Sequence, residues 1–348
     1  MLMKIGIEYE FTLKDKANNY LDFDNTEYGL FKQVVDDFPY YENDAKVFEC
    51  KSLEKVPKRC YVEGFERYDT SGKLLGTIPK GLEIRTLPHA TIDEALEELD
   101  NSYSHIKNSA ELLGLSPLEV SYHPFKNFIA LQTPLNSFEI DLRKKSNALS
   151  ADIALNAMLW HSIQINVSID NSTTKQMTNL VQKINYYAPF IIPFSFSSPF
   201  CNGEPFKGLS YRSYVRSSMR QIVKLQKRNE IDVIEFMGFD TFYNLSLFKA
   251  LLLLFKGLLI DTTLTKRALS RDIEYLQRSA LKGFEDEAIK QEGIAVFSAA
   301  KAALKEEGAA LQHLETMLQT NDSYAARMKR TYQETGDIME TISNKYNY

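Results

Sequence analysis

Cysteine is scarce in this sequence: 348 residues contain only Cys50, Cys60 and Cys201, and no C-x-x-C pair occurs. An odd, widely spaced set does not form a disulfide framework, and without a Cys/His cluster a zinc site is not expected. No secretory signal opens the chain, so we expect a reduced, cytoplasmic setting. Whether Cys50 and Cys60 pair across a hairpin stays open.

The usual nucleotide-binding loops are also missing, because neither G-x-x-x-x-G-K-[ST] nor G-x-G-x-x-G occurs. The net charge of −5 gives no indication of a nucleic-acid partner. The most apolar run, Leu247–Ile260, contains Lys249 and Lys256 and is too short to cross a bilayer, so we expect a buried helix and no membrane association. A nucleotide site in this chain therefore needs another architecture.

The first strand-like segment carries two carboxylates. Side chains alternate along a strand, so Ile5, Ile7, Tyr9 and Phe11 share one face while Glu8 and Glu10 share the other. Two acids about 7 Å apart on one face are either simply solvated or ligands for a hard cation such as Mg2+. At this point both interpretations remain open.

Two further strands have a polar face opposite an apolar one. His161, Ile163, Ile165, Val167 and Ile169 alternate with Gln164 and Asn166, and the segment ending at Thr86 presents Glu83 and Arg85. An antiparallel sheet with one wet face explains each strand taken alone. Amides and carboxylates are nevertheless poor strand formers, which favours a concave sheet face that binds a cation and a polar ligand.

The remaining pattern predicts an α+β fold. We expect helices near 27–37, 91–113, 151–159 and 172–187, three or four strands between 46 and 86, and strands at 118–122 and 233–236. From 246 onward the pattern is helical. We interpret 1–348 as a single catalytic domain, with a sheet-containing part over 1–245 and a helical part over 246–348.

Arg212 and Arg216 follow a loop rich in serine and would share one face of a helix. Arginine pairs suit carboxylates and phosphates, although a surface loop followed by a charged helix is an equal alternative. His161 reads as a core histidine, whereas His123 could border a site.

Six motifs in order give the chain a resemblance to a known family. They are Ile5-Gly6-Ile7-Glu8-Tyr9-Glu10, Glu83, Ile163-Gln164-x-Asn166, Ser198-Pro199-Phe200-x-x-Gly203, Ser210-Tyr211-Arg212-Ser213 and Ile234-Glu235-x-x-Gly238-x-Asp240. Together they resemble glutamate–cysteine ligase, in the branch shared by plant-type enzymes and bacterial carboxylate–amine ligases.

The resemblance implies a glutamine-synthetase-like fold: a curved, mainly antiparallel sheet with its site on the concave face and helices on the convex face. It implies ATP and Mg2+, with Mn2+ as an alternative, and an amide formed through an acyl phosphate. By the same resemblance, the metal ligands are Glu8, Glu10, Glu83, Gln164 and Glu235, and the catalytic residues are Arg212 and Glu235. For a site of this kind we expect ATP contacts from Gln164, Asn166, Ser198, Lys207, Arg212 and Arg216. We expect substrate contacts from Arg85, His123 and Tyr211.

One position departs from the family pattern. The usual Glu-x-Arg is replaced by Glu235-Phe236-Met237, so a cation expected near the transferred phosphate is missing. Either Arg85, Lys207, Arg212 or Arg216 supplies the charge, or the activity is altered.

The default reaction is γ-glutamyl-cysteine-like, with small amino-acid and amine substrates. Alternatives are a ligase acting on a peptide or protein carboxylate and a non-catalytic regulatory subunit that binds nucleotide. Whether the chain forms a homo-oligomer stays open.

Overall fold

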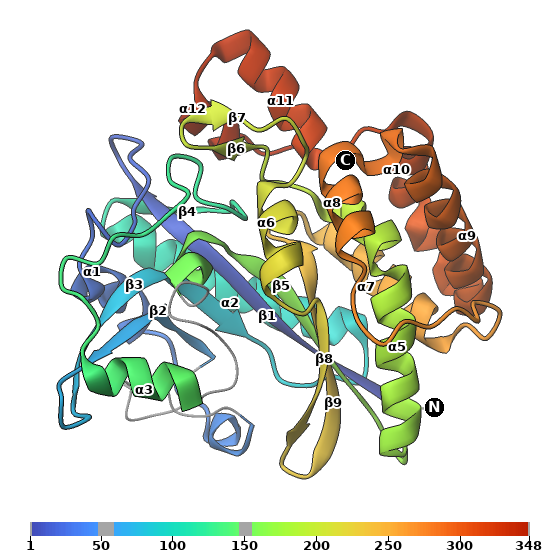
Figure 1. Cartoon of the computed structure of the whole chain (residues 1–348), viewed down its shortest axis with the longest axis horizontal. Coiled ribbons are helices and arrows are strands. Elements are labelled where there is room, and N and C mark those ends of the chain that lie inside the picture. The colour runs from blue at the N-terminus through green and yellow to red at the C-terminus, as the bar shows by residue number, and fades with distance from the viewer. Residues whose placement is uncertain (1, 48–58, 146–154, 347–348) are drawn as a thin grey trace.

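A computed structural model describes residues 2–47, 59–145 and 155–346 of the chain, and its centre is one antiparallel sheet (Figure 1). The strand order is β2-β3-β1-β5-β9-β8, and β4 pairs with the far end of β1. The strands of this sheet are β1 (Met3–Asp15), β2 (Cys60–Tyr68), β3 (Leu74–Arg85), β4 (Leu115–Leu118), β5 (Ser162–Ile169), β8 (Val223–Arg228) and β9 (Ile231–Asp240). A separate small hairpin joins β6 (Phe200–Cys201) and β7 (Glu204–Pro205).

Helices precede, interrupt and follow the strands, and they dominate the last third of the chain. They are α1 (Tyr28–Asp36), α2 (Ile92–Leu112), α3 (Ser137–Lys145), α5 (Thr174–Ile191), α6 (Tyr211–Met219), α7 (Leu245–Ile260), α8 (Ile273–Lys282), α9 (Glu287–Leu304), α10 (Gln312–Thr320), α11 (Tyr324–Thr335) and α12 (Ile338–Ser343). Short 3-10 turns are η1 (Glu42–Lys46), η2 (Ala157–Leu159), η3 (Ile192–Ser195), η4 (Gly283–Glu285) and η5 (Lys305–Leu311). No helix in these described ranges is long and apolar enough to cross a membrane.

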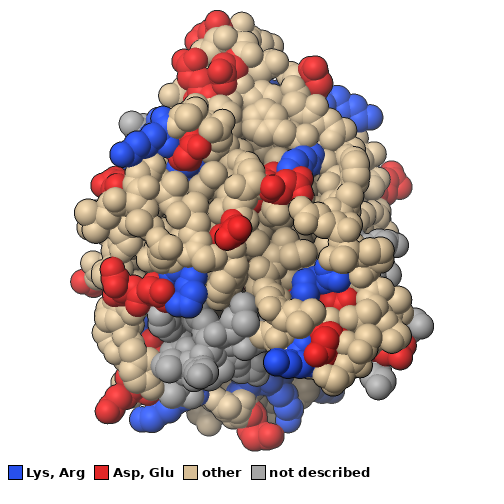
Figure 2. All heavy atoms as spheres, turned by 90° about the vertical axis from the view of Figure 1, so that its left-hand side faces the viewer, with Lys and Arg blue, Asp and Glu red and all other residues tan. Residues whose placement is uncertain are grey.

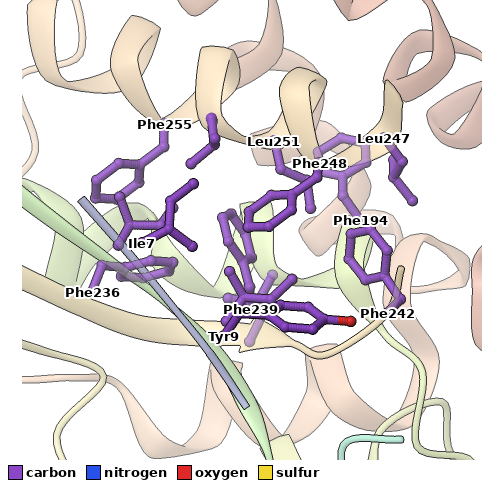
Figure 3. Packing of buried hydrophobic residues seen from close by; sticks show 14 of the residues in the cluster. Ile7, Tyr9, Phe194, Phe236, Phe239, Phe242, Leu247, Phe248, Leu251 and Phe255 are labelled. Carbon is purple, nitrogen blue, oxygen red and sulfur yellow. The ribbon is translucent and has the colours of Figure 1, made fainter. Parts of the chain in front are cut away.

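The apolar face of the sheet packs against α7, which lies across β1 and β9 (Figure 3). Phe236 of β9 stacks on Phe255 of α7 with ring centroids 4.8 Å apart, and Ile7 and Tyr9 of β1 are fully buried beside them. Full burial of each such side chain contributes about 1.5–3 kcal/mol, so this layer fixes which face of every strand turns inward. The opposite face is thereby left for the polar side chains.

Several predicted elements are confirmed at their predicted places. Helix α2 begins at a capping box, in which the side chain of Thr91 accepts a hydrogen bond from the Glu94 amide and the Glu94 carboxylate accepts one from the Thr91 amide. Strand β5, the helical assignment of Arg212 and Arg216, and the helical last third are also observed. The fold class predicted from sequence is therefore confirmed.

Other boundaries were wrong. The predicted strand at 118–122 forms earlier, over Leu115–Leu118, because its ladder with β1 ends where Leu118 faces Thr12. The predicted strand at 233–236 is ten residues long and pairs with β8, which was not predicted. Their turn is Asn229-Glu230, both with positive φ, and Glu230 is not a residue that signals such a turn.

Part of the predicted strand region between residues 46 and 86 lies outside the described residues, since 48–58 are not described. The described residues there form two long strands, β2 and β3, joined by the turn near Gly72. Helix α3 was not predicted. Of the helix predicted at 151–159, residues 151–154 lie outside the described ranges, as does Cys50, and Ala157–Leu159 form a 3-10 turn.

Charge is mixed on the face formed by α1, α3 and the β2–β3 hairpin. Figure 2 shows basic and acidic groups interspersed there, without an extended area of either sign. This distribution gives no indication of a polyanion-binding surface on that face.

Candidate active site

The strand register gathers the predicted polar residues on one face. Glu8 of β1 lies opposite Arg85 of β3 on one side and Gln164 of β5 on the other, and Glu10 lies opposite Glu83. Residues directly opposite in an antiparallel pair point to the same side of the sheet. The next pair outward, Asn166 and Glu235, extends the same face to β9, so one face carries acids from three strands.

Three carboxylates meet near β2 and β3. One oxygen from each of Glu10, Glu63 and Glu83 lies within 4.8 Å of the other two, a spacing that can hold a metal ion. Glu10 and Glu83 are almost completely buried. Buried like charges repel strongly, so this cluster requires a compensating cation.

Lys80 supplies part of that compensation. Its ammonium nitrogen lies 2.9 Å from Glu10 Oε2 and 2.7 Å from Glu63 Oε2, and its side chain is 4% exposed. Burial alone would raise the pKa of Glu10, but the attraction of Lys80 outweighs it and the pKa is lowered. Burial likewise opposes the charge of Lys80, and the two glutamates raise its pKa. Glu10 and Lys80 are therefore charged at neutral pH.

A second acidic pair lies toward β9. Arg228 Nη2 lies 3.2 Å from an oxygen of Glu8 and 3.2 Å from an oxygen of Glu235, while Lys224 contacts the other oxygen of Glu235 at 3.1 Å. Both cationic side chains are nearly half exposed, at 43% and 47%. Burial, then the neighbouring Glu8 carboxylate, raises the pKa of Glu235. An additional cation at this pair would relieve that repulsion.

These oxygens fit a hard divalent cation. Carboxylates and amide carbonyls are the ligands that Mg2+ and Mn2+ take in proteins. Asn166 donates from Nδ2 to Glu8 at 3.0 Å, and its buried Oδ1 has no hydrogen-bond partner among the described residues. An unpaired buried carbonyl beside two acids is costly unless a cation or its water binds there. Gln164 is directed differently, because its amide nitrogen donates to Glu10 at 2.8 Å.

A cavity of about 290 Å³ opens beside the acids. Its wall combines Glu10, Glu63, Gln164 and Glu235 with the cations Lys80, Arg143, Arg216, Arg220 and Lys224, and with Met237. Metal-type acids and anion-binding groups therefore face the same space.

Like Arg220, whose Nε is buried without a hydrogen-bond partner, Arg216 is a cation of this wall that lacks an ion pair with the described residues. It is 5% exposed and finds no hydrogen bond or ion pair for its guanidinium among the residues described here. Burial, then the nearby guanidinium groups of Arg212 and Arg220, lowers its pKa well below the ordinary value. A buried arginine without a partner favours an anion in the cavity it faces.

Arg212, in contrast, does not line the cavity. Its Nη2 donates to the carbonyl oxygen of Met237 at 2.9 Å, and its Nη1 reaches Gly238 O and Asp240 Oδ1, both at 3.3 Å. Ser198 also contacts Asp240, because its hydroxyl donates a 2.9 Å hydrogen bond to Asp240 Oδ2. Three of the sequence motifs thus meet at the buried Asp240, where they join α6 to β9.

The other predicted contacts are scattered. Lys207 is exposed in the loop after β7, and Tyr211 packs on Tyr122 with ring centroids 4.7 Å apart. His123 Nε2 lies 2.8 Å from Asp22, away from the cavity wall. Arg85 is buried on the acid-bearing face with its guanidinium 4.6 Å from the Tyr61 ring. His161 is buried, and burial followed by the charge of Lys80 lowers its pKa to about 3, as a neutral core histidine requires.

Sequence reasoning missed six charged cavity or cluster residues: Glu63, Lys80, Arg143, Arg220, Lys224 and Arg228. The alternation of Glu63 with Val62 and of Lys224 with Val223 and Leu225 was a usable signal. Lys80 gave none, because Pro79-Lys80-Gly81 resembles a turn between strands.

Comparison with known proteins identifies the family. A profile of glutamate–cysteine ligase family 2 matches residues 4–224, which is most of the chain. The chain belongs to this family of carbon–nitrogen ligases. A curated relative from Ruegeria pomeroyi, named "Putative glutamate–cysteine ligase 2", is 27% identical over 133 residues, or 38% of this chain and 32% of that protein. The match thus spans about a third of that relative.

Solved structures support the fold assignment. Glutamate–cysteine ligase from Francisella tularensis, in complex with AMP, aligns with a TM-score of 0.61 at 14% identity, over 98% of this chain and 87% of that one. The ligase PafA in complex with the prokaryotic ubiquitin-like protein Pup aligns with a TM-score of 0.53 at 9% identity, over 97% and 70%. The glutamine-synthetase-like architecture predicted from the six motifs is confirmed.

Proposed function

We propose that this family member is an ATP- and Mg2+-dependent carboxylate–amine ligase that forms an amide through an acyl phosphate. One observation carries the proposal: Glu235, an acid suited to a divalent cation, and the buried Arg216 face the same cavity. Phosphoryl transfer requires both kinds of group, because negative charge must be neutralised on the phosphate oxygens. The nucleotide complex of the Francisella relative is consistent with the choice of ATP.

The chemistry has two steps. A carboxylate oxygen of the acid substrate attacks the γ-phosphorus of ATP, and the bond to the ADP oxygen breaks. The amine nitrogen then attacks the acyl carbon, inorganic phosphate leaves with the former carboxylate oxygen, and the amine loses a proton. Bound Mg2+ would supply positive charge to the ATP phosphates, held by acids from the set Glu8, Glu10, Glu83 and Glu235 together with Asn166.

The cationic wall of the cavity takes the role of the arginine that Met237 replaces. Arg216, with Arg220 in the same wall, is suited to bind the transferred phosphoryl group. A nucleotide-binding regulatory subunit could use the same arginine, so ADP formation is what separates the catalytic role from the regulatory one. A cavity near 300 Å³ lies at the low end for small-ligand sites and favours amino-acid and amine substrates over a protein tail.

The test is ADP release with ATP and Mg2+ against a matrix of amino acids and amines, with products identified by mass. Glutamate with cysteine is the default pair. Glu235→Gln should lower turnover about 100-fold or more, because a charged cation ligand is lost. Glu230→Gln, at the exposed tip of the same β8–β9 hairpin, should leave turnover unchanged. Release of no ADP with any pair, although ATP binds, would overturn the proposal.

A further inference from the structure

Lys80 reaches the acid cluster through an irregularity in β3. In a regular strand it would share a face with Leu82 and Ile84, which are buried in the core. Glu63 of β2 lies opposite Gly81 and Gly64 lies opposite Pro79, so Lys80 is an extra residue without an opposite partner. This β-bulge turns its side chain to the acid-bearing face.

Two glycines fix the bulge in place. A Cβ atom on Gly81 would lie 2.4 Å from the carbonyl oxygen of Phe11, and one on Gly64 would lie 2.2 Å from that of Ile78. Strands approach this closely only where a side chain is absent. The lysine is therefore delivered to the cluster by a specific local structure rather than by a flexible side chain that happens to reach it.

The contacts of Glu10 occupy most of its acceptor positions. Its Oε2 accepts from Lys80 Nζ at 2.9 Å, from the Ser162 amide at 2.9 Å and from the Ser162 hydroxyl at 3.3 Å. Its Oε1 accepts from Gln164 at 2.8 Å. A carboxylate offers about four acceptor positions, two on each oxygen, so both positions of Oε2 and one of Oε1 are taken.

The cations at the two ends of the acid set differ in how exposed they are, and so in how easily a metal ion could displace them. Lys224 and Arg228 are nearly half exposed and can swing into water when a metal ion approaches Glu8 and Glu235. Lys80 is 4% exposed and cannot withdraw without leaving Glu10 and Glu63 unpaired in the interior. A metal ion placed beside it would also be repelled by its charge.

We propose that Lys80 is a built-in cation of the acid cluster and that its ammonium group takes the place of a metal ion at Glu10 and Glu63. The acids that bind divalent metal are then Glu8 and Glu235. The inference deepens the proposed function, because it divides the acids of that site between an internal cation and a metal ion. It also predicts that Glu10, the partner of Glu8 in the sequence motif, positions the strand and does not ligate metal.

The first test measures Mn2+ binding to the metal-free protein without ATP, by the electron paramagnetic resonance signal of free Mn2+. Glu63→Gln should change the Mn2+ affinity by less than about twofold, whereas Glu235→Gln should weaken it about tenfold or more. Glu63 is partly exposed, so this variant is expected to fold. Equal weakening in the two variants would overturn the inference.

The second test counts bound ions. Lys80→Met should bind one more Mn2+ per chain than the wild type, because Glu10 and Glu63 become available. Lys224→Met, which removes an exposed lysine from the same cavity, should not add a site. An unchanged count in Lys80→Met contradicts the inference, and if that variant does not fold, Glu63→Gln decides. Failure of the proposed function is read separately, as absence of ATP turnover in the wild type.

Discussion

The guanidinium group of Arg212 donates a 2.9 Å hydrogen bond to the carbonyl oxygen of Met237, so this arginine supports the strand beside the cavity and does not face into it. Its ion pair with Asp240 is fully buried. Arg212→Met should lower the free energy of unfolding by about 3–5 kcal/mol, because Asp240 keeps a buried charge without its cation. Denaturant unfolding measures this, and Arg216→Met, one helical turn away, should destabilise far less. Equal losses in the two variants would contradict the distinction.

Replacing Arg216 should affect turnover much more than stability. Arg216→Met is expected to lower the rate of ADP formation about 100- to 1,000-fold, because a positioned cation near the transferred phosphoryl group is lost. Met237→Arg should restore part of that rate in the Arg216→Met background and should not raise it in the wild type. Steady-state kinetics of the wild type, the two single variants and the double variant measure these rates. A faster Met237→Arg single variant would instead mean that the family arginine is a real loss.

Gly81 and Gly76 lie on the same strand and give a matched pair for stability. A Cβ atom at Gly81 would lie 2.4 Å from Phe11 O and 2.9 Å from His161 Nε2, whereas nothing lies within 4 Å of one at Gly76. Gly81→Ala should therefore cost about 1–3 kcal/mol of unfolding free energy, and Gly76→Ala less than about 0.5 kcal/mol. Thermal and denaturant unfolding are the measurements. A neutral Gly81→Ala would show that β1 and β3 are not packed as closely as described.

His161 should make stability depend on pH. Its pKa is lowered to about 3 in the folded protein, from a normal value of 6.5. Between these values the unfolded chain binds a proton that the folded protein does not, so stability falls as the pH drops from about 6.5 toward 3.

The variant His161→Asn removes this titration while an amide can still donate to Val120 O, as His161 Nδ1 is placed to do. The wild type should lose up to about 1.4 kcal/mol more stability per pH unit than the variant across that window. Unfolding free energies measured at pH 7, 6 and 5 give the two slopes. Parallel slopes would mean that the pKa of His161 is not lowered in the folded protein.

Strict alternation made the inner strands predictable from sequence. Glu8, Gln164 and Asn166 lie on the face that the pattern assigns them, because the apolar residues between them can be buried only on the other side. The division of 1–348 into sheet and helical parts remains a prediction about domains. Which of the acids bind the metal ion also remains a prediction.

What the pattern missed depends on long-range geometry. Lys80 is displaced by a bulge, and a period-two pattern assigns it to the wrong face. Arg212 and Arg216 were indistinguishable as neighbours on one helix face, yet only Arg216 lines the cavity, because Asp240 of β9 takes Arg212. Which arginine the strand would engage depended on a register that local sequence does not specify.

The acyl-phosphate step itself can be followed with oxygen isotopes. Glutamate carrying 18O in its γ-carboxylate, or the acid found by the substrate screen, is converted with ATP, Mg2+ and the amine, and the inorganic phosphate is analysed by mass. The account predicts one 18O in phosphate for each amide formed, because the attacking carboxylate oxygen leaves with the phosphorus. Phosphate without label, or label recovered in AMP, would contradict it.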